Sequence, residues 1–238
     1  MAPSQTLKWI ESGKNPSEQD VEIEGTEPYI VGGHTASGYW VNTRRETTIH
    51  RLYAAGDVAG GCPQKYVTGA LAEGELAAED IMEKITKDAE MKPEKTVLDK
   101  LEQDARKIIA EYERILDVSG ETKEQSLYSI EELEEAMQKV MDEYAGGISV
   151  NYQFNEKQLA LAEEKIAQLT KLADEVTADN MHELLFAYEL KERLIVCRSL
   201  IAHLRARKET RWHSFNENLD YPDTDEKYYK YVNSKLEN

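Results

Sequence analysis

The sequence contains little cysteine and has no excess of positive charge. It has only two cysteines, Cys62 and Cys197, which lie far apart along its 238 residues. Two thiols cannot build a four-ligand iron–sulfur or zinc site within one chain, and they favour reduced cysteines in a cytoplasmic protein over a disulfide. Lys and Arg number 29 against 46 Asp and Glu, for a formal charge of −17. Because nucleic-acid phosphates are neutralised by excess Lys and Arg, we expect no nucleic-acid partner.

Long apolar runs are missing as well. No segment approaches the roughly 18 apolar residues of a membrane span, and the first residues lack the pattern of a signal peptide. The apolar fraction of 40% is below, and the charged fraction of 32% above, what is typical of globular domains. Aliphatic residues nevertheless recur at regular spacings. The composition therefore favours a soluble, helix-rich protein with thin layers over a disordered chain.

The pattern of glycines and apolar residues predicts three regions. Residues 1–92 are turn-rich, with short strands expected at 29–31, 39–41 and 52–55 and one helix at 69–90. Residues 93–208 show helical periodicity and predict an antiparallel bundle. Residues 209–238 form an aromatic-rich tail that packs either on its own bundle or on another chain. The expected class is α+β, mostly helical.

Four helices are expected in the bundle. The first spans 94–116 and carries one apolar face, formed by Leu98, Leu101, Ala105, Ile108, Ile109, Tyr112, Ile115 and Leu116. The second begins at Ser129, where Glu132 completes a capping box, and the third begins at Asn155. The fourth spans about 179–207. His182 and His203 lie on this last helix about six turns apart, and we expect no metal site.

The segment that carries chemistry is Leu52-Tyr-Ala-Ala-Gly-Asp57. It predicts a short buried strand that ends in Gly56, where a ligand can approach the backbone, and in Asp57, which can accept a hydrogen bond from a sugar or ribityl hydroxyl. A helix then begins at Thr68-Gly-Ala-Leu71, and its free N–H groups favour negative charge. The pair suits an extended polar cofactor with an anionic head, although an ordinary strand-to-turn junction has the same residues.

This segment resembles the second FAD-binding motif of the glutathione-reductase-like flavoproteins. Its continuation, Gly74-Glu-Leu-Ala-Ala78, is similar to the following helix in the fumarate reductase and succinate dehydrogenase flavoprotein family. The resemblance implies that FAD is the cofactor, that the Gly-Asp carboxylate holds the ribityl chain, and that the helix start faces the flavin ring. These roles would fall on Gly56, Asp57, Thr68, Gly69, Ala70 and Leu71.

Other blocks resemble the adenylylsulfate reductase alpha subunits within this group. They are residues 27–34, 36–41, 63–66, 207–212, 220–222 and 231–235. Pro28 and Lys65 stand where fumarate reductases carry a His and a substrate-clamping Arg, and Lys lacks the bidentate fork of Arg. By resemblance, His34 and Lys65 would face the flavin and an anionic substrate as catalytic residues. Taken alone, His34 is more typical of a structural or exposed histidine, and Lys65 of an ordinary surface lysine.

No Gly-x-Gly-x-x-Gly fingerprint for a cofactor pyrophosphate occurs in the sequence. The family carries it near its N-terminus, so we expect this chain to be the C-terminal part of a longer flavoprotein, inactive without the missing FAD-binding and capping region. The resemblance implies adenylylsulfate reduction with electrons from an iron–sulfur subunit. The alternatives are another flavoprotein of the same family with a different substrate, or a non-catalytic helical interaction module.

Overall fold

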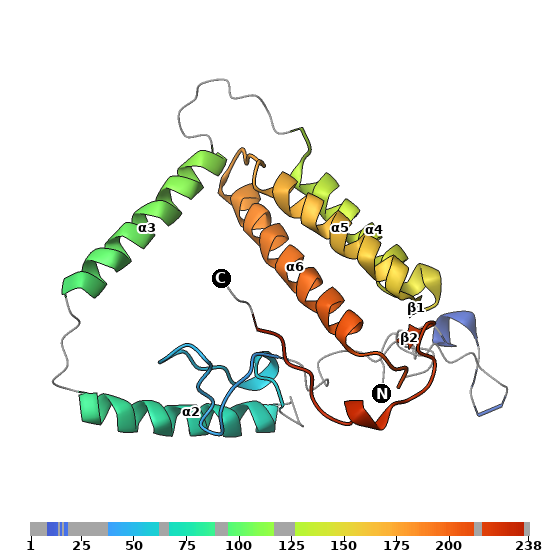
Figure 1. Cartoon of the computed structure of the whole chain (residues 1–238), viewed down its shortest axis with the longest axis horizontal. Coiled ribbons are helices and arrows are strands. Elements are labelled where there is room, and N and C mark those ends of the chain that lie inside the picture. Colours follow the sequence, from blue (N-terminus) through green and yellow to red (C-terminus); the bar gives the residue numbers. More distant parts are fainter. Residues whose placement is uncertain are drawn as a thin grey trace. The chain divides into compact units, whose positions relative to one another are not determined.

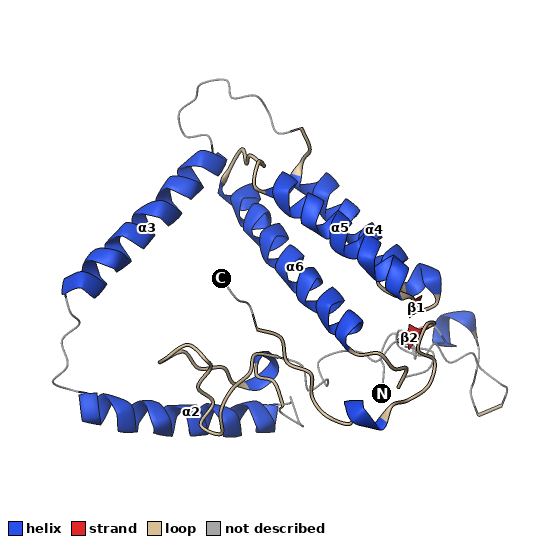
Figure 2. Cartoon of the chain, viewed as in Figure 1, coloured by secondary structure: helices blue, strands red, loops and turns tan. Residues whose placement is uncertain are grey.

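The structure is a computed structural model that describes residues 9–13, 15, 17–18, 38–61, 67–88, 95–116, 127–211 and 216–235. Helices dominate these residues (Figure 2). They are α2 (Val67–Asp88), α3 (Lys95–Leu116), α4 (Ile130–Tyr144), α5 (Glu156–Ala173) and α6 (Met181–Ala206). The remaining elements are β1 (Gln153–Phe154), β2 (Glu217–Asn218) and the short 3-10 helices η1 (Gly56–Val58), η2 (Ile148–Val150) and η3 (Glu226–Tyr228). The predicted mostly helical α+β class is confirmed, and each of α2 to α6 starts within two residues of its predicted position. Residues 9–12 also form a helical turn, which the sequence pattern does not predict.

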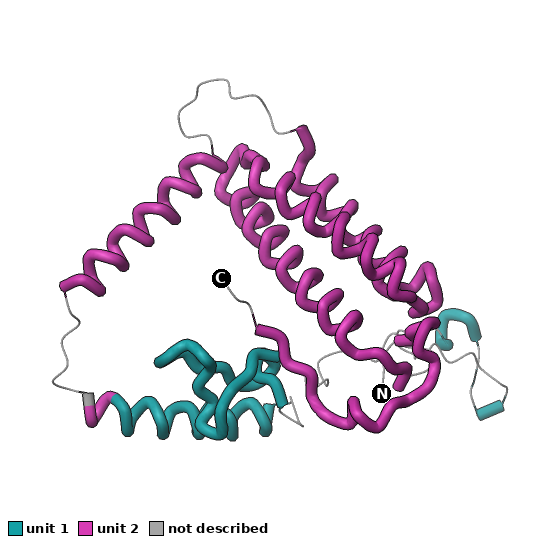
Figure 3. The backbone as a smooth tube through the Cα atoms, in the orientation of Figure 1, with its two compact units in different colours: residues 1–84 teal, residues 85–238 magenta. Residues whose placement is uncertain are grey.

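The chain divides into two compact units, Met1–Lys84 and Ile85–Asn238 (Figure 3). The first contains the Gly56-Asp57 turn and most of α2. The second contains α3 to α6 and the tail. None of the described helices is long and apolar enough to cross a membrane.

Helices α4, α5 and α6 pack against one another as an antiparallel bundle (Figure 1). The predicted capping box starts α4: Ser129 Oγ accepts the Glu132 N–H at 3.1 Å, and the Glu132 carboxylate accepts the Ser129 N–H at 2.8 Å. Asn155 caps α5 by accepting the Gln158 N–H at 2.8 Å. The three helices bury a common apolar core, made of Leu133, Met137, Val140, Ala162, Ile166, Leu169, Ala173, Leu184, Ala187, Leu190, Leu194 and Ile201.

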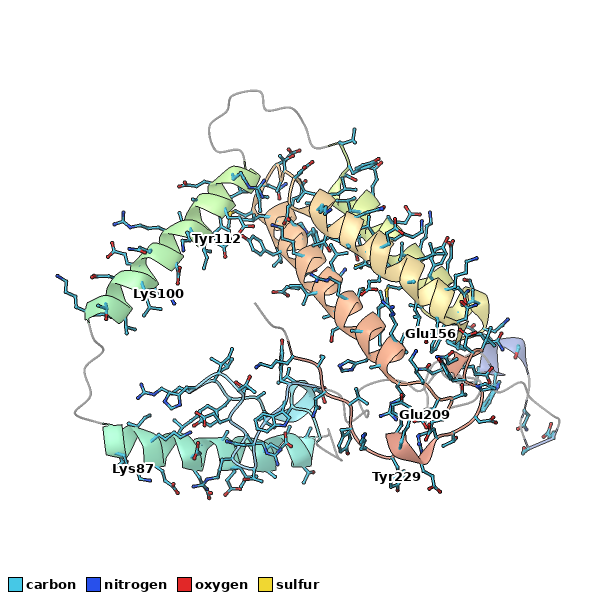
Figure 4. All side chains as sticks on the ribbon, in the orientation of Figure 1. Lys87, Lys100, Tyr112, Glu156, Glu209 and Tyr229 are labelled. Atoms are coloured by element: carbon cyan, nitrogen blue, oxygen red, sulfur yellow. The ribbon has the colours of Figure 1, made fainter. Side chains whose placement is uncertain are left out.

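Helix α3, expected as the fourth member of the bundle, joins it through its last turns. Ile115 is fully buried, Tyr112 meets Tyr188 edge-to-face at 5.1 Å between ring centroids, and Lys191 pairs with Glu111 at 2.7 Å. Figure 4 shows Tyr112 on α3. The large aliphatic residues on the rest of the predicted apolar face are 48–60% exposed, at Leu98, Leu101, Ile108 and Ile109. Periodicity shows that these residues share a face, but not which surface covers that face.

The described tail packs on the end of its own bundle, which was one of the two expected arrangements; the other was packing on another chain. Strand β2 pairs with β1 in parallel, with the Leu219 N–H donating to the Phe154 carbonyl at 2.8 Å. The fully buried carboxylate of Glu209 accepts from Arg207 at 2.6 Å, from Arg211 at 2.8 Å and from the Asp225 N–H at 2.9 Å. Figure 4 labels Glu209 beyond the end of α6 and Glu156 at the start of α5.

The predicted strands of the first unit are not regular strands. Residues 52–55 are extended, but only Ala54 among them is buried and Leu52 is 50% exposed. Within residues 38–61 the pairing consists of two isolated bridges, Tyr39 with Ala59 and Glu46 with Tyr53. Each segment finds a backbone partner over a single residue, so no ladder forms. The segment predicted at 29–31 lies outside the described residues.

Candidate functional site

The candidate site is the turn that contains Gly56 and Asp57. Two backbone contacts hold the chain that enters it: the Ala54 N–H donates to the Arg45 carbonyl at 3.0 Å, and the Thr47 N–H donates to the Leu52 carbonyl at 2.8 Å. The chain that leaves it is held by the Tyr39 N–H, which donates to the Val58 carbonyl at 2.7 Å. The turn is therefore fixed from both sides by neighbouring loops.

Gly56 brings this turn into contact with the start of α2. Its φ of +73° lies in the left-handed region, which favours glycine, and it is buried. A Cβ placed on Gly56 would lie 3.2 Å from the Cβ of Ala70, which is tighter than ordinary side-chain contact. The predicted neighbours Gly56 and Ala70 thus pack directly together, and only a glycine allows the backbone to come this close.

Asp57 and the first turn of α2 are open to solvent. Asp57 is exposed, and so are Val67 at 76% and Leu71 at 70%. The helix begins at Val67, so Thr68 lies within its first turn rather than before it. No acidic residue occupies that turn, so the N–H groups and the positive end of the helix dipole are not neutralised by a carboxylate of the turn itself.

Glu73 anchors the turn to the helix. It is 5% exposed, and its Oε2 accepts the Gly56 N–H at 2.8 Å. Its Oε1 pairs with Arg45 at 3.2 Å. A buried carboxylate needs both a charge partner and hydrogen-bond donors, and Glu73 has one of each. The contact links three segments, residues 45, 56 and 73, that lie in different parts of the first unit.

A second polar cluster follows on the same side of α2. The Tyr53 hydroxyl donates to Asp80 at 2.6 Å, and Lys84 reaches Asp80 at 2.7 Å and Glu46 at 2.7 Å. Hydrogen bonds from Lys84 and Tyr53 lower the pKa of Asp80, and hydrogen bonds from Lys84 and the Arg51 amide lower the pKa of Glu46. Burial and the neighbouring Asp80 raise the pKa of Tyr53. The cluster is a closed network of ion pairs that fastens residues 46–53 to α2.

Sequence reasoning missed Glu73 and Asp80, although the signal is present. Glu73, Ala77, Asp80 and Lys84 follow the 4-3-4 spacing of a single helix face, and the first three are buried. Such a stripe is usually apolar. Acids at its buried positions indicate that cations or hydrogen-bond donors must lie opposite. The Arg45 guanidinium, the Gly56 N–H and the Tyr53 hydroxyl provide them.

The two predicted catalytic residues, His34 and Lys65, lie outside the described residues, as does Cys62. Among the residues that are described, no group of three or more His, Cys, Asp or Glu side chains is arranged to hold a metal ion. Of the predicted cofactor-binding residues, the structure brings Gly56 directly against Ala70, with Asp57 next to Gly56 in the chain and Thr68, Gly69 and Leu71 next to Ala70 on α2.

These residues fit one end of a flavin cofactor. Gly56 packs against Ala70 and so holds the turn at the start of α2, Asp57 presents a carboxylate at the surface, and the first turn of α2 has N–H donors without an acidic residue of its own. The Asp57 carboxylate can accept a hydrogen bond from a ribityl hydroxyl. The N–H groups at the start of α2 can interact favourably with an electron-rich edge of the flavin ring.

Comparison with protein-family models and with curated proteins finds no match. Solved structures do match. Adenylylsulfate reductase from the hyperthermophilic Archaeoglobus fulgidus is 28% identical with a TM-score of 0.68, covering 95% of this chain and 38% of that chain. Adenosine-5-phosphosulfate reductase in complex with sulfite, as a covalent adduct, gives the same values. A variant of the E. coli quinol fumarate reductase FrdA is 19% identical with a TM-score of 0.64, covering 82% of this chain and 33% of that chain, and shows the fold alone.

The comparisons confirm the predicted resemblance to adenylylsulfate reductase and to the fumarate reductase flavoprotein. The chain spans 38% of the length of the first adenylylsulfate reductase that it matches.

Proposed function

We propose that this chain, similar over 95% of its length to part of adenylylsulfate reductase, supplies the ribityl-binding side of an FAD site in a flavin-dependent reductase. The observation that carries the proposal is the direct packing of Gly56 on Ala70. This packing sets the Gly-Asp turn beside the N-terminus of α2, and the two features together suit a flavin better than either does alone.

Each side chain has a definite task in this proposal. FAD, when bound, supplies two-electron transfer between an electron donor and the substrate. Asp57 accepts a hydrogen bond from a ribityl hydroxyl and fixes the cofactor along its length. The N–H groups at Thr68, Gly69 and Ala70, with Leu71 closing the turn, favour negative charge at the ring edge.

The substrate and the partners follow from the resemblance. We propose adenylylsulfate as substrate, His34 and Lys65 as donors to its anionic oxygens, and an iron–sulfur subunit as electron donor in the cytoplasm. The missing pyrophosphate-binding and capping region would come from elsewhere in a longer protein. Another flavoprotein with a different substrate is the second candidate, because FrdA shares the fold and Lys65 replaces the Arg of fumarate reductases.

Loss of the Asp57 carboxylate tests the cofactor assignment. The chain should purify without colour and bind added FAD weakly, because no glycine fingerprint holds the pyrophosphate. Asp57→Ala should weaken this binding about ten- to a hundredfold, the loss of one charge-assisted hydrogen bond. Quenching of FAD fluorescence on titration with protein measures the affinity. Glu75→Ala removes an exposed carboxylate from α2 and is the matched control. Equal affinity of the Asp57 variant and the control would remove Asp57 from the site.

The substrate assignment needs an enzyme that contains both this chain and the missing region. There, His34→Ala and Lys65→Ala should each lower turnover about a hundredfold while FAD stays bound, since each removes one positioned donor. Rates with adenylylsulfate and with fumarate as electron acceptor separate the two candidate functions. Near-normal rates of both variants on both acceptors would end the assignment of these two residues.

A further inference from the structure

Glu73 and Arg45 connect the segments that meet at the Gly56 turn, and sequence motifs assign neither of them a role. Glu73 accepts the Gly56 N–H at 2.8 Å and pairs with Arg45 at 3.2 Å. We propose that Glu73, neutralised by Arg45, is a positioning residue that holds the Gly56-Asp57 turn in its cofactor-binding geometry. The inference rests on the proposed FAD site. It adds that the Glu73–Arg45 pair determines the position of Asp57 in that site.

The burial of the contact is the first argument. Gly56 is buried, so its N–H must find a partner within the protein. Glu73 provides that partner with a carboxylate that is itself 5% exposed. A hydrogen bond to a charged acceptor is shorter and stronger than a neutral one, and the guanidinium of Arg45, 3.2 Å away, compensates the charge of this carboxylate.

The conformation of Arg45 is the second argument. Arg45 has a φ of +69°, in the left-handed region that non-glycine residues rarely adopt, and such strain persists only where surrounding contacts enforce it. Its carbonyl accepts the Ala54 N–H at 3.0 Å while its guanidinium pairs with Glu73. Arg45 therefore holds the chain that enters the turn both directly and through Glu73.

The position of Asp57 depends on this arrangement. Asp57 follows Gly56 directly, and Gly56 lies against Ala70 on the first turn of α2. Glu73 comes three residues after Ala70, on the same side of the helix. If the Glu73 contact is lost, the backbone at Gly56 is no longer fixed to the helix, and the carboxylate of Asp57 no longer has a fixed distance from the helix N-terminus.

The test uses the isotope-labelled 238-residue chain and two measurements on each variant. Amide hydrogen exchange at Gly56, without ligand, reports whether the turn is held. Titration with FAD, followed through the amide signals of Gly56 and Asp57, reports whether the site binds. The variants are Glu73→Ala, Glu73→Gln and Arg45→Gln, with Glu75→Ala as the exposed control on the same helix.

We expect Glu73→Ala to speed exchange at Gly56 by about tenfold or more and to weaken FAD binding by about tenfold, whereas Glu75→Ala changes neither. Glu73→Gln keeps an acceptor for the Gly56 N–H and should restore most of the slow exchange at Gly56 and most of the FAD affinity. A general loss of packing would not be repaired in this way. If Arg45 acts through Glu73, adding Arg45→Gln to Glu73→Ala should weaken FAD binding no further.

Two results would overturn the inference. One is unchanged exchange at Gly56 in Glu73→Ala, and the other is faster exchange with unchanged FAD affinity. If the wild-type chain shows no response to FAD at Gly56 or Asp57, the proposed FAD site fails. The exchange data, measured without FAD, still show whether Glu73 holds the turn, so failure of the proposed function and failure of the Glu73 contact are distinguishable.

Discussion

The buried side chains of α4 to α6 are apolar, whereas those that α2 turns toward residues 44–56 are mostly charged. In the described part of the first unit, the buried hydrophobic residues are all alanines, Ala54, Ala59 and Ala77, and Glu73 and Asp80 are buried as well. The bundle buries branched and long aliphatic residues instead, such as Leu190, Leu194 and Ile166. The bundle is thus stabilised by close apolar packing, and the Gly56 region by ion pairs and hydrogen bonds.

This difference has a consequence for function. Apolar packing contains no titrating group, so it responds little to pH and to changes of single surface charges. Polar networks fix directions, because a hydrogen bond has a preferred geometry, and the candidate site needs a directed Gly56 N–H and a placed Asp57. The region that would bind the cofactor is therefore the one we expect to respond to pH, salt and single charge substitutions.

The largest effect should come from a cavity in the bundle. Leu194 is fully buried in the core, so Leu194→Ala should destabilise the second unit by about 3 kcal/mol. Ile195, the next residue, is 62% exposed, and Ile195→Ala should cost far less. Urea unfolding followed by circular dichroism at the helix band measures both. Equal costs would mean that the apolar core is not what holds α6.

The second largest loss of stability should come from removing the buried charge of Glu209 in the tail. Glu209→Gln leaves Arg207 and Arg211 without their carboxylate and should destabilise the second unit by about 2 kcal/mol, since both arginines are partly solvated. Glu226→Gln, an exposed change in the same tail, is the control. Urea unfolding again gives the free energy, and an equal loss in both variants would show that Glu209 does not anchor the tail.

The sequence predicted the bundle better than the site. Capping residues such as Ser129 and Asn155 and regular apolar spacing act locally, so helix positions were predicted within two residues. The contact between Gly56 and Ala70 agrees with the predicted pairing of a turn with a helix start. The place of Glu73 was not predicted, because its partners Arg45 and Gly56 are distant in sequence and no short motif joins them. The exposure of the apolar face of α3 was not predicted either, because periodicity along the helix does not show which distant segment covers that face.

The pH response of the first unit tests the comparison directly. The pKa values of Glu46 and Asp80 are lowered in the folded protein from 4.5 and 3.8. Both carboxylates therefore stabilise the folded protein when the pH is above their ordinary pKa values of 4.5 and 3.8. This stabilisation is lost as the pH falls further, through their lowered pKa values in the folded state. Below about pH 4, amide protection in residues 44–56, the intrinsic exchange rate divided by the observed rate, should therefore fall more than protection in α5 and α6. Asp80→Asn should reduce this acid response, and a parallel loss of protection in both units would contradict the comparison.

The smallest effect should come from the exposed face of α3. Leu101 is 60% exposed, so Leu101→Gln should change the free energy of unfolding by no more than about 0.5 kcal/mol. Ile115→Ala, on the same helix but fully buried, should cost about 3 kcal/mol. Thermal unfolding of the two variants shows whether α3 is joined to the bundle only through its last turns. A large loss from Leu101→Gln would restore the full four-helix bundle.

The central claim is that the Gly56-Asp57 turn and the start of α2 together receive a flavin. The most direct measurement is a titration of the isotope-labelled chain with FAD, followed over all assigned amide signals. The account predicts saturable shifts concentrated at Gly56, Asp57 and residues 68–71, with α4 to α6 unchanged, and a weaker response in Asp57→Ala. The absence of shifts at these residues up to the solubility limit of FAD, or shifts confined to the helical bundle, would contradict it.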